Sequence, residues 1–200
     1  MRYKALVCML WLLWGCGPVA EAPEDQRQTR QQQQFPVVAN PIETEIMPPK
    51  PHQGWIACGG RWTAGEGAGI GAGFADQLEA AVVNAGITGE PLPGLLQRLP
   101  QLLDRKPDGL ILEVGQEDEA LNAPPKAFQK HLNTLGTKLS EYPGLKLIVL
   151  VSAQDASYRE PIAAFAEKQG AQLLSGDAFA SPPTAVQHDA LAEQVRQMLY

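Results

Sequence analysis

The stretch Lys106-Pro-Asp-Gly-Leu-Ile-Leu-Glu-Val-Gly-Gln-Glu-Asp118 decides how the rest of the chain folds. Its centre, residues 110–114, is a nearly continuous apolar run between Gly109 and Gly115. Such a run is too short for a typical helix and indicates a β-strand buried on both faces. In open parallel sheets, ligands bind just past the carboxyl ends of the strands, which here means residues 115–118. We therefore expect the functional residues at this edge of a sheet.

Further apolar runs and helix patterns alternate along residues 54–200, which we interpret as one domain. The runs predict strands at residues 55–58, 82–86, 145–151 and 171–174. A Gly-rich loop at 65–73 precedes the first predicted helix, which contains Phe74, Leu78 and Ala81. Helical spacing of apolar residues predicts four more helices. They lie at 92–105, from Pro124 onward, around Ile162, Phe165 and Ala166, and around Leu191, Val195 and Leu199. Alternating strands and helices favour an α/β fold with three α/β/α layers and a flavodoxin-like, five-stranded parallel sheet.

The N-terminal residues have the features of a bacterial secretion signal. Arg2 and Lys4 precede an apolar core at residues 5–14, which is shorter than the roughly 20 residues needed to span a bilayer as a helix. The sequence Leu13-Trp-Gly-Cys16 resembles the lipobox of bacterial lipoproteins. That resemblance implies removal of residues 1–15 and acylation of Cys16 by fatty acids such as palmitate. Because Gly17 is not acidic, it also implies the periplasmic face of the outer membrane.

Residues 16–53 form the second region, which contains many prolines and a Gln-rich tract. A segment with so few large apolar side chains cannot offset its ordering entropy, so we expect a disordered tether. The net charge of the chain is −6, and removal of residues 1–15 with two basic and no acidic residues brings it to −8. This charge argues against nucleic acid as a partner, whereas the lipid anchor implies a membrane. Cys58 is expected to be a small buried side chain.

Four blocks of the predicted domain resemble those of the SGNH/GDSL hydrolases, the esterases and acyl hydrolases that include the thioesterase I and lysophospholipase L1 type. The blocks are Thr63-Ala-Gly65, Val82-Val-Asn-Ala-Gly-Ile-Thr-Gly89, Pro107-Asp-Gly-Leu-Ile-Leu-Glu-Val-Gly115 and Pro183-Thr-Ala-Val-Gln-His-Asp-Ala-Leu-Ala192. Their order and spacing are those of the family. The resemblance implies the family's fold, with its active site at the carboxyl edge of the sheet.

The family's catalytic positions hold other residues in this chain. Arg61 stands where the family has its serine nucleophile, and arginine stays protonated and cannot attack a carbonyl. Glu117 replaces an asparagine that donates to the oxyanion, and a carboxylate repels that charge. The degenerate active-site positions are Gly60, Arg61, Gly86, Glu117, Phe179 and Pro182. Of these, only Gly86 keeps the family's residue, whose backbone N–H helps line the oxyanion site. The pattern predicts a pseudoenzyme with no catalytic residue.

Arg61 and Glu117 allow two interpretations if the family's geometry holds. A bidentate salt bridge between them could plug the old pocket. Alternatively, Arg61, Glu117 and the neighbouring Trp62 could bind an anionic or carbohydrate ligand.

A relocated triad would draw on Ser152 and Asp155 after the fourth strand and on His188 in the last helix. His188 falls beyond the family's catalytic histidine, so we expect it to point away from the site. Glu113 and residues 117–119 have no identified partner and are interpreted as a strand end and a solvated loop.

Cofactor and metal signals are weak. Gly67-x-Gly69-x-x-Ala72 resembles a dinucleotide fingerprint, but no suitable acidic residue ends the second strand, so a flexible loop without a cofactor is favoured. Scattered histidines without paired cysteines offer no metal site.

Two functions follow from this sequence. The first is a membrane-anchored periplasmic lipoprotein whose inactive SGNH/GDSL-like domain binds an envelope protein or glycan or serves in envelope assembly. The alternative is a GDSL-type esterase or acyl hydrolase with relocated catalytic residues.

Overall fold

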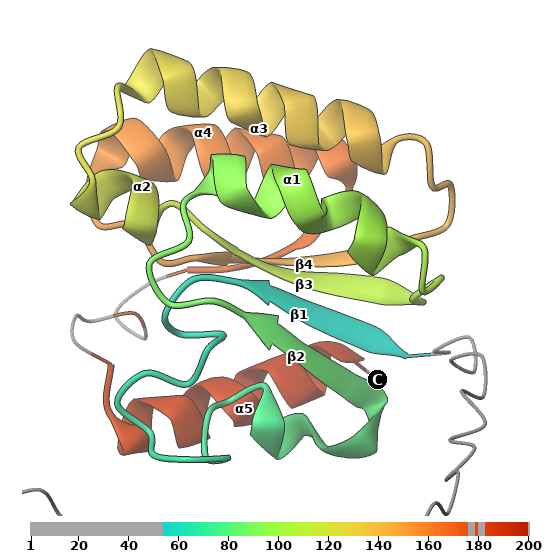
Figure 1. Cartoon of the computed structure of the whole chain (residues 1–200), viewed down its shortest axis with the longest axis vertical. Coiled ribbons are helices and arrows are strands. Elements are labelled where there is room, and N and C mark those ends of the chain that lie inside the picture. Colours follow the sequence, from blue (N-terminus) through green and yellow to red (C-terminus); the bar gives the residue numbers. More distant parts are fainter. Residues whose placement is uncertain (1–53, 176–178, 180–182, 200) are drawn as a thin grey trace, which may run out of the picture. The chain divides into compact units, whose positions relative to one another are not determined.

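A five-stranded parallel sheet forms the centre of the domain, as predicted (Figure 1). The computed structural model describes residues 54–175, 179 and 183–199, so the predicted signal at 1–15 and the tether at 16–53 lie outside the described residues. The strand order is β2-β1-β3-β4-β5, which is the flavodoxin-like order. The strands are β1 (Trp55–Gly59), β2 (Val82–Gly86), β3 (Gly109–Val114), β4 (Lys146–Val151) and β5 (Gln172–Leu174).

Helices cover both faces of this sheet and complete the predicted three layers (Figure 1). They are η1 (Asp76–Ala81), α1 (Leu92–Leu103), α2 (Gln116–Ala120), α3 (Pro125–Leu139), α4 (Ala156–Gln169) and α5 (Ala185–Leu199). Successive strand residues point to opposite faces. Leu110 and Leu112 therefore join the core beneath α1, α3 and α4, while Ile111 joins the core beneath α5. Burial on both faces explains why the strands read as continuous apolar runs.

The helices begin and end where local chemistry favours it. Pro125 opens α3, where a missing N–H costs nothing. The Asp155 side chain accepts a hydrogen bond from the Ser157 N–H at 2.7 Å and so caps α4, which ends at Gly170 in the left-handed region. The inward positions predicted for α1 and α3 are buried: Leu95, Leu99, Leu102 and Leu103 in α1, and Phe128, Leu132, Leu135 and Leu139 in α3.

Two local predictions were wrong. The helix expected after the Gly-rich loop is the short 3-10 helix η1, although Phe74 and Leu78 are buried as expected. The glycines at 65, 67, 69 and 71 have positive φ. Because an α-helix needs consecutive residues with negative φ, no α-helix can begin in this loop. The expected loop after β3 is instead the helix α2, whose acidic first turn suits the positive end of a helix.

Across the described ranges, no helix has both the length and the apolar composition needed to cross a bilayer.

Candidate functional site

The candidate site lies where β1 and β3 end side by side. These strands are neighbours in the sheet, so the loops that follow them meet at the carboxyl edge. Gly59 has φ +145°, and a Cβ added there would lie 2.3 Å from the Glu113 carbonyl oxygen. Only glycine allows this close approach, which brings Arg61 after β1 beside Glu117 in α2.

Arg61 and Glu117 form the salt bridge that the sequence suggested. The Arg61 Nε–Glu117 Oε1 distance is 2.9 Å and the Nη2–Oε2 distance is 3.1 Å. The Arg61 side chain is 22% exposed and that of Glu117 only 7%. Burial raises the pKa of Glu117, but the hydrogen bonds and charge of Arg61 outweigh this effect and hold the pKa below its ordinary value. The hydrogen bond to Glu117 in turn raises the pKa of Arg61.

The structure leaves little empty space beside this pair. The remaining cavity beside Gly60 and Glu117 has a volume of about 10 Å³, room for one water molecule. A pocket for a small organic ligand needs about 300 Å³ or more. As arranged here, the site cannot enclose such a ligand.

Backbone N–H groups that could stabilise an oxyanion already have partners. The Arg61 N–H donates to Glu117 Oε1 at 3.2 Å, and the Gly86 N–H donates to the Asn84 side-chain oxygen at 3.0 Å. A Cβ added to Gly86 would lie 2.3 Å from the backbone nitrogen of Ala64. The glycine kept at this position therefore allows close backbone packing, and its N–H does not face an open site. No sequence pattern indicated that the Asn84 side chain accepts this hydrogen bond.

Glu113 has a structural role that its interpretation as a strand end missed. It is 3% exposed, and its carboxylate accepts hydrogen bonds from the Thr63 N–H and hydroxyl, both at 2.8 Å, and from the Trp62 N–H at 3.3 Å. Burial raises the pKa of Glu113, and these donors offset it only in part. Glu113 thus fixes the loop that carries Arg61. A carboxylate within a strand buried on both faces was the available signal, because it must find donors.

The solvated loop predicted at residues 117–119 was also wrong. Asp118 is buried and accepts from the Leu92 N–H at 3.0 Å, and burial raises its pKa. Glu119 accepts from the Gln154 and Asp155 N–H groups at 2.7 and 2.9 Å. These carboxylates hold neighbouring loops in place.

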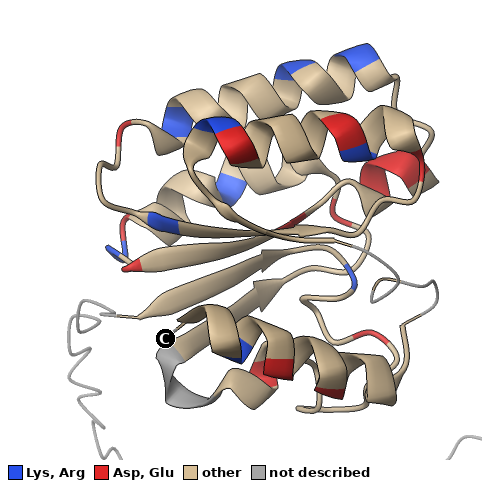
Figure 2. Ribbon diagram, turned by 180° about the vertical axis from the view of Figure 1, so that it is seen from behind, with Lys and Arg blue, Asp and Glu red and all other residues tan. Residues whose placement is uncertain are grey.

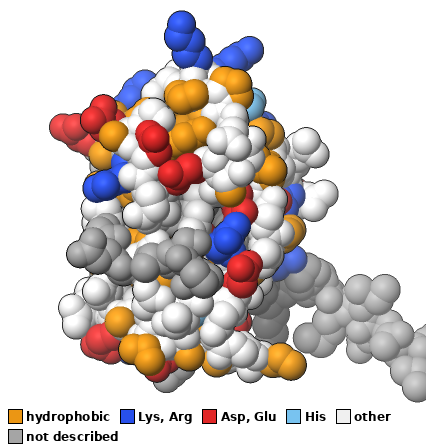
Figure 3. All heavy atoms as spheres, turned by 90° about the vertical axis from the view of Figure 1, so that its left-hand side faces the viewer, with side chains coloured by type: hydrophobic (Ala, Val, Ile, Leu, Met, Phe, Trp, Pro, Cys, Tyr) orange, Lys and Arg blue, Asp and Glu red, His pale blue; other side chains and the backbone are white. Residues whose placement is uncertain are grey.

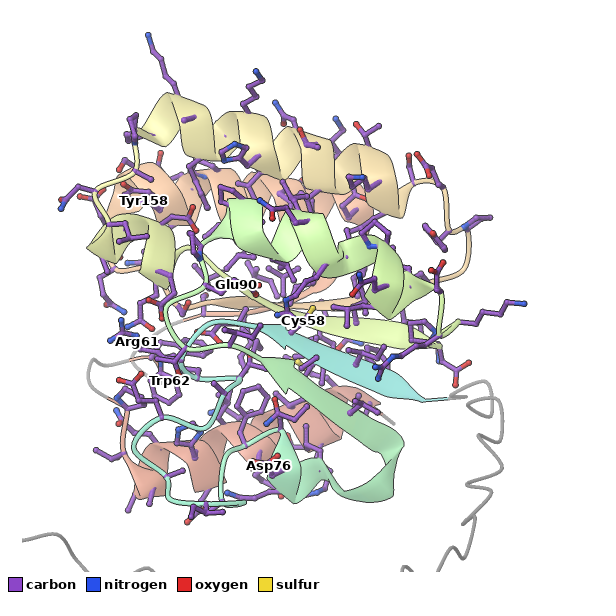
Figure 4. The ribbon with its side chains drawn as sticks, in the orientation of Figure 1. Cys58, Arg61, Trp62, Asp76, Glu90 and Tyr158 are labelled. Atoms are coloured by element: carbon purple, nitrogen blue, oxygen red, sulfur yellow. The ribbon has the colours of Figure 1, made fainter. Side chains whose placement is uncertain are left out.

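Trp62 is not available to a ligand, because it is fully buried. Its ring lies edge-on to Phe179, with centroids 5.3 Å apart, and 5.2 Å from the His188 ring. Figure 4 shows Arg61 and Trp62, adjacent in the chain, on the loop after β1. Phe179, one of the predicted degenerate positions, is thus a buried core residue. Pro182 lies outside the described residues.

The structure does not assemble the relocated triad. His188 does not point away but is fully buried, with Nδ1 accepting from the Phe74 N–H at 3.2 Å and Nε2 within 2.9 Å of the Glu66 carbonyl oxygen. Ser152 is buried and donates to the Val114 carbonyl oxygen at 3.3 Å, and Asp155 caps α4. Both ring nitrogens of His188 are therefore engaged by the backbone and unavailable to Ser152.

Cys58 is fully buried, and burial raises the pKa of its thiol to about 12. Within the described part of the chain, no group of three or more His, Cys, Asp or Glu side chains is arranged to hold a metal ion.

Solved structures with a similar fold include SGNH/GDSL esterases and related proteins. The esterase EstA from Pseudoalteromonas sp. superimposes with a TM-score of 0.60 at 19% identity, covering 74% of this chain and 99% of that one. A crystal structure of TesA gives a TM-score of 0.60 at 24% identity, covering 74% and 98%. A G-D-S-L family lipolytic protein from Desulfitobacterium hafniense DCB-2 gives 0.58 at 17%, covering 72% and 98%. The chain has the SGNH/GDSL hydrolase fold.

Sequence comparison agrees with this SGNH/GDSL assignment over part of the chain. The chain is 32% identical to esterase TesA of Pseudomonas aeruginosa PAO1 over 99 residues, which are 49% of this chain. The match spans less than half of that curated relative, 44% of its length. No family model matches the chain. The resemblance inferred from the four SGNH/GDSL blocks is confirmed.

Proposed function

We propose that the chain is a non-catalytic SGNH/GDSL domain that works by binding in the bacterial envelope. The observation that carries this proposal is the Arg61–Glu117 salt bridge at the nucleophile position. The block resemblance implies that Arg61, a permanent cation, stands at the family's serine position, and the cavity beside Glu117 has a volume of only about 10 Å³. Ester hydrolysis needs a nucleophile, a base and oxyanion donors, and these positions offer none of the three in usable form.

The same proposal places the domain on a lipoprotein. Its support is the sequence Leu13-Trp-Gly-Cys16, which matches a lipobox, followed by the Pro- and Gln-rich residues 17–53. Acylated Cys16 would anchor the protein at the periplasmic face of the outer membrane, with residues 16–53 as the tether. Several acyl chains give stable anchoring, whereas one binds only marginally.

An ester-turnover assay tests the proposal against the esterase alternative. The mature chain is incubated with p-nitrophenyl acetate and butyrate, and its rate is compared with that of Ser152→Ala. We expect both proteins to release p-nitrophenol at the buffer rate, because Ser152 donates to a backbone carbonyl and contacts no base. Turnover well above background that falls in Ser152→Ala would establish the esterase alternative.

A further inference from the structure

The carboxyl edge of the sheet bears a group of exposed apolar side chains around the plugged site. Among the described residues, six large apolar side chains are exposed, and four of them lie at this edge. Ile70 lies on the Gly-rich loop, Ile87 follows β2, Leu121 follows α2 and Val186 lies in the first turn of α5. We call these four residues the carboxyl-edge surface. Figure 3 views this edge and shows orange apolar side chains along its lower margin.

Ile70 and Val186 belong to segments that touch each other. A Cβ added to Gly67 would lie 2.1 Å from the Pro183 carbonyl oxygen, so the Gly-rich loop packs against the residues that open α5. Ile70 is fully exposed and Val186 is 76% exposed. Residues 67–75 carry no charge. Burying exposed aliphatic side chains against a partner removes apolar surface from water, which favours binding.

Charge at this edge is predominantly negative. The loops that follow β1 to β4, at residues 59–66, 86–91, 115–124 and 152–155, carry six acidic residues and one basic residue. Arg61 pairs with Glu117 and, at 3.8 Å, with Glu66, and Arg98 of α1 pairs with Glu90. Glu66, Glu119 and Asp155 retain contact with solvent. Figure 2 shows α2 largely red, with blue segments along α3 above it.

We infer that the carboxyl-edge surface docks a basic, amphipathic segment of a protein partner. This inference rests on the proposed binding function and names the class of partner. Apolar groups of the partner would cover Ile70 and Val186, while its Lys or Arg side chains meet the acidic rim. The cavity beside Gly60 and Glu117 holds only one water, so a small ligand does not fit beneath Arg61 and Glu117. An anionic bilayer or nucleic acid would be repelled by the acidic rim.

Site-specific photocrosslinking tests this inference in cells that make the lipidated protein. The photoreactive residue p-benzoylphenylalanine replaces Val186, and in matched controls it replaces Leu173 or Tyr142, which are exposed elsewhere at 38% and 37%. We expect a protein adduct from position 186 only, with the crosslinked partner peptide rich in Lys or Arg and apolar residues. Adding Ile70→Asp should reduce the adduct at least fivefold, while Leu173→Asp leaves it unchanged.

The remaining outcomes overturn the inference. These are no adduct from position 186, equal adducts from the control positions, an adduct to lipid only, or a crosslinked peptide without basic residues. Ile70 has no buried atoms to disturb, so Ile70→Asp should stay folded, which circular dichroism checks. Ester turnover by the unmodified chain would refute the proposed non-catalytic function without changing the crosslinking result, so the two failures are distinguishable.

Discussion

At the residue scale, the two buried carboxylates Glu113, in β3, and Glu117, in α2, are stabilised in different ways. Glu117 is neutralised by Arg61, whereas Glu113 has no basic partner and relies on three hydrogen-bond donors from the loop at Trp62 and Thr63. The motif comparison suggested the Arg61–Glu117 pair because both residues replace family residues that share a site. It could not reveal Glu113's partners, because they lie about 50 residues earlier and no local pattern links them.

Removing Arg61 should destabilise the domain. Arg61→Ala leaves the Glu117 carboxylate buried without its counter-charge, which should cost about 2–4 kcal/mol of the free energy of unfolding. Arg196→Ala is the matched control, since Arg196 pairs with Glu193 on the surface at 41% and 59% exposure and should cost about 1 kcal/mol or less. Urea unfolding measures both. If the two variants lose the same free energy of unfolding, the buried pair stabilises the domain no more than the surface pair does.

The contributions of Glu117 and Glu113 to the free energy of unfolding should change with pH in opposite directions. The pKa of Glu117 is lowered in the folded state, so its stabilising effect is present above the ordinary glutamate pKa of 4.5 and is lost as the pH falls through the folded-state pKa. The pKa of Glu113 is raised, so the folded state binds the proton more tightly and loses stability as the pH rises above 4.5. The wild type's advantage over Glu117→Gln should therefore shrink on acidification. Relative to Glu113→Gln, the wild type should instead gain stability on acidification.

Urea unfolding between pH 3 and 8 measures these differences. If both differences from wild type are independent of pH, the assignment of the two environments is wrong.

At the element scale, the strands and long helices followed from apolar spacing, because both faces of the sheet are buried and each helix buries one stripe. The short elements did not. η1 and α2 are five or six residues long, too short for any periodic signal, and tertiary contacts fix them. His188 was also misplaced, because its inward turn depends on Trp62 and Phe74, which belong to a distant segment.

The end of β2 should tolerate no side chain at Gly86. A Cβ there would lie 2.3–2.8 Å from atoms of Thr63 and Ala64, two of them backbone, so Gly86→Ala should cost about 2–3 kcal/mol. Gly89→Ala is the control: it meets open space and bears only the strain of φ +78°, about 1 kcal/mol. Thermal unfolding ranks the two variants. A Gly86→Ala variant as stable as Gly89→Ala would contradict the close packing of β2 on that loop.

At the scale of the whole molecule, the fold is that of the SGNH/GDSL esterases, but the centre of the site is a salt bridge. The sequence predicted this fold because its blocks keep the family's order. It could not predict how far the pocket had closed, since volume depends on side chains from several loops. It also gave no hint of the carboxyl-edge surface, because single exposed apolar residues look alike in sequence.

The lipid anchor is testable without touching the domain. Cys16→Ala removes the acylated residue, so the protein should move from the membrane fraction to the soluble periplasmic fraction. The domain should stay folded, because residue 16 lies outside the domain predicted at residues 54–200. Fractionation followed by immunoblotting measures the shift. A Cys16→Ala protein that stays with the membrane at the wild-type level would contradict the anchor.

The most direct measurement of the central claim is labelling of the mature chain with a fluorophosphonate probe, read by intact-protein mass spectrometry. The probe reacts with an activated serine, and the block resemblance implies that Arg61 stands at the position of that serine. A non-catalytic function predicts no adduct after an incubation that labels an active SGNH esterase to completion. A stoichiometric adduct on one serine, abolished when that serine is changed to alanine, would contradict it.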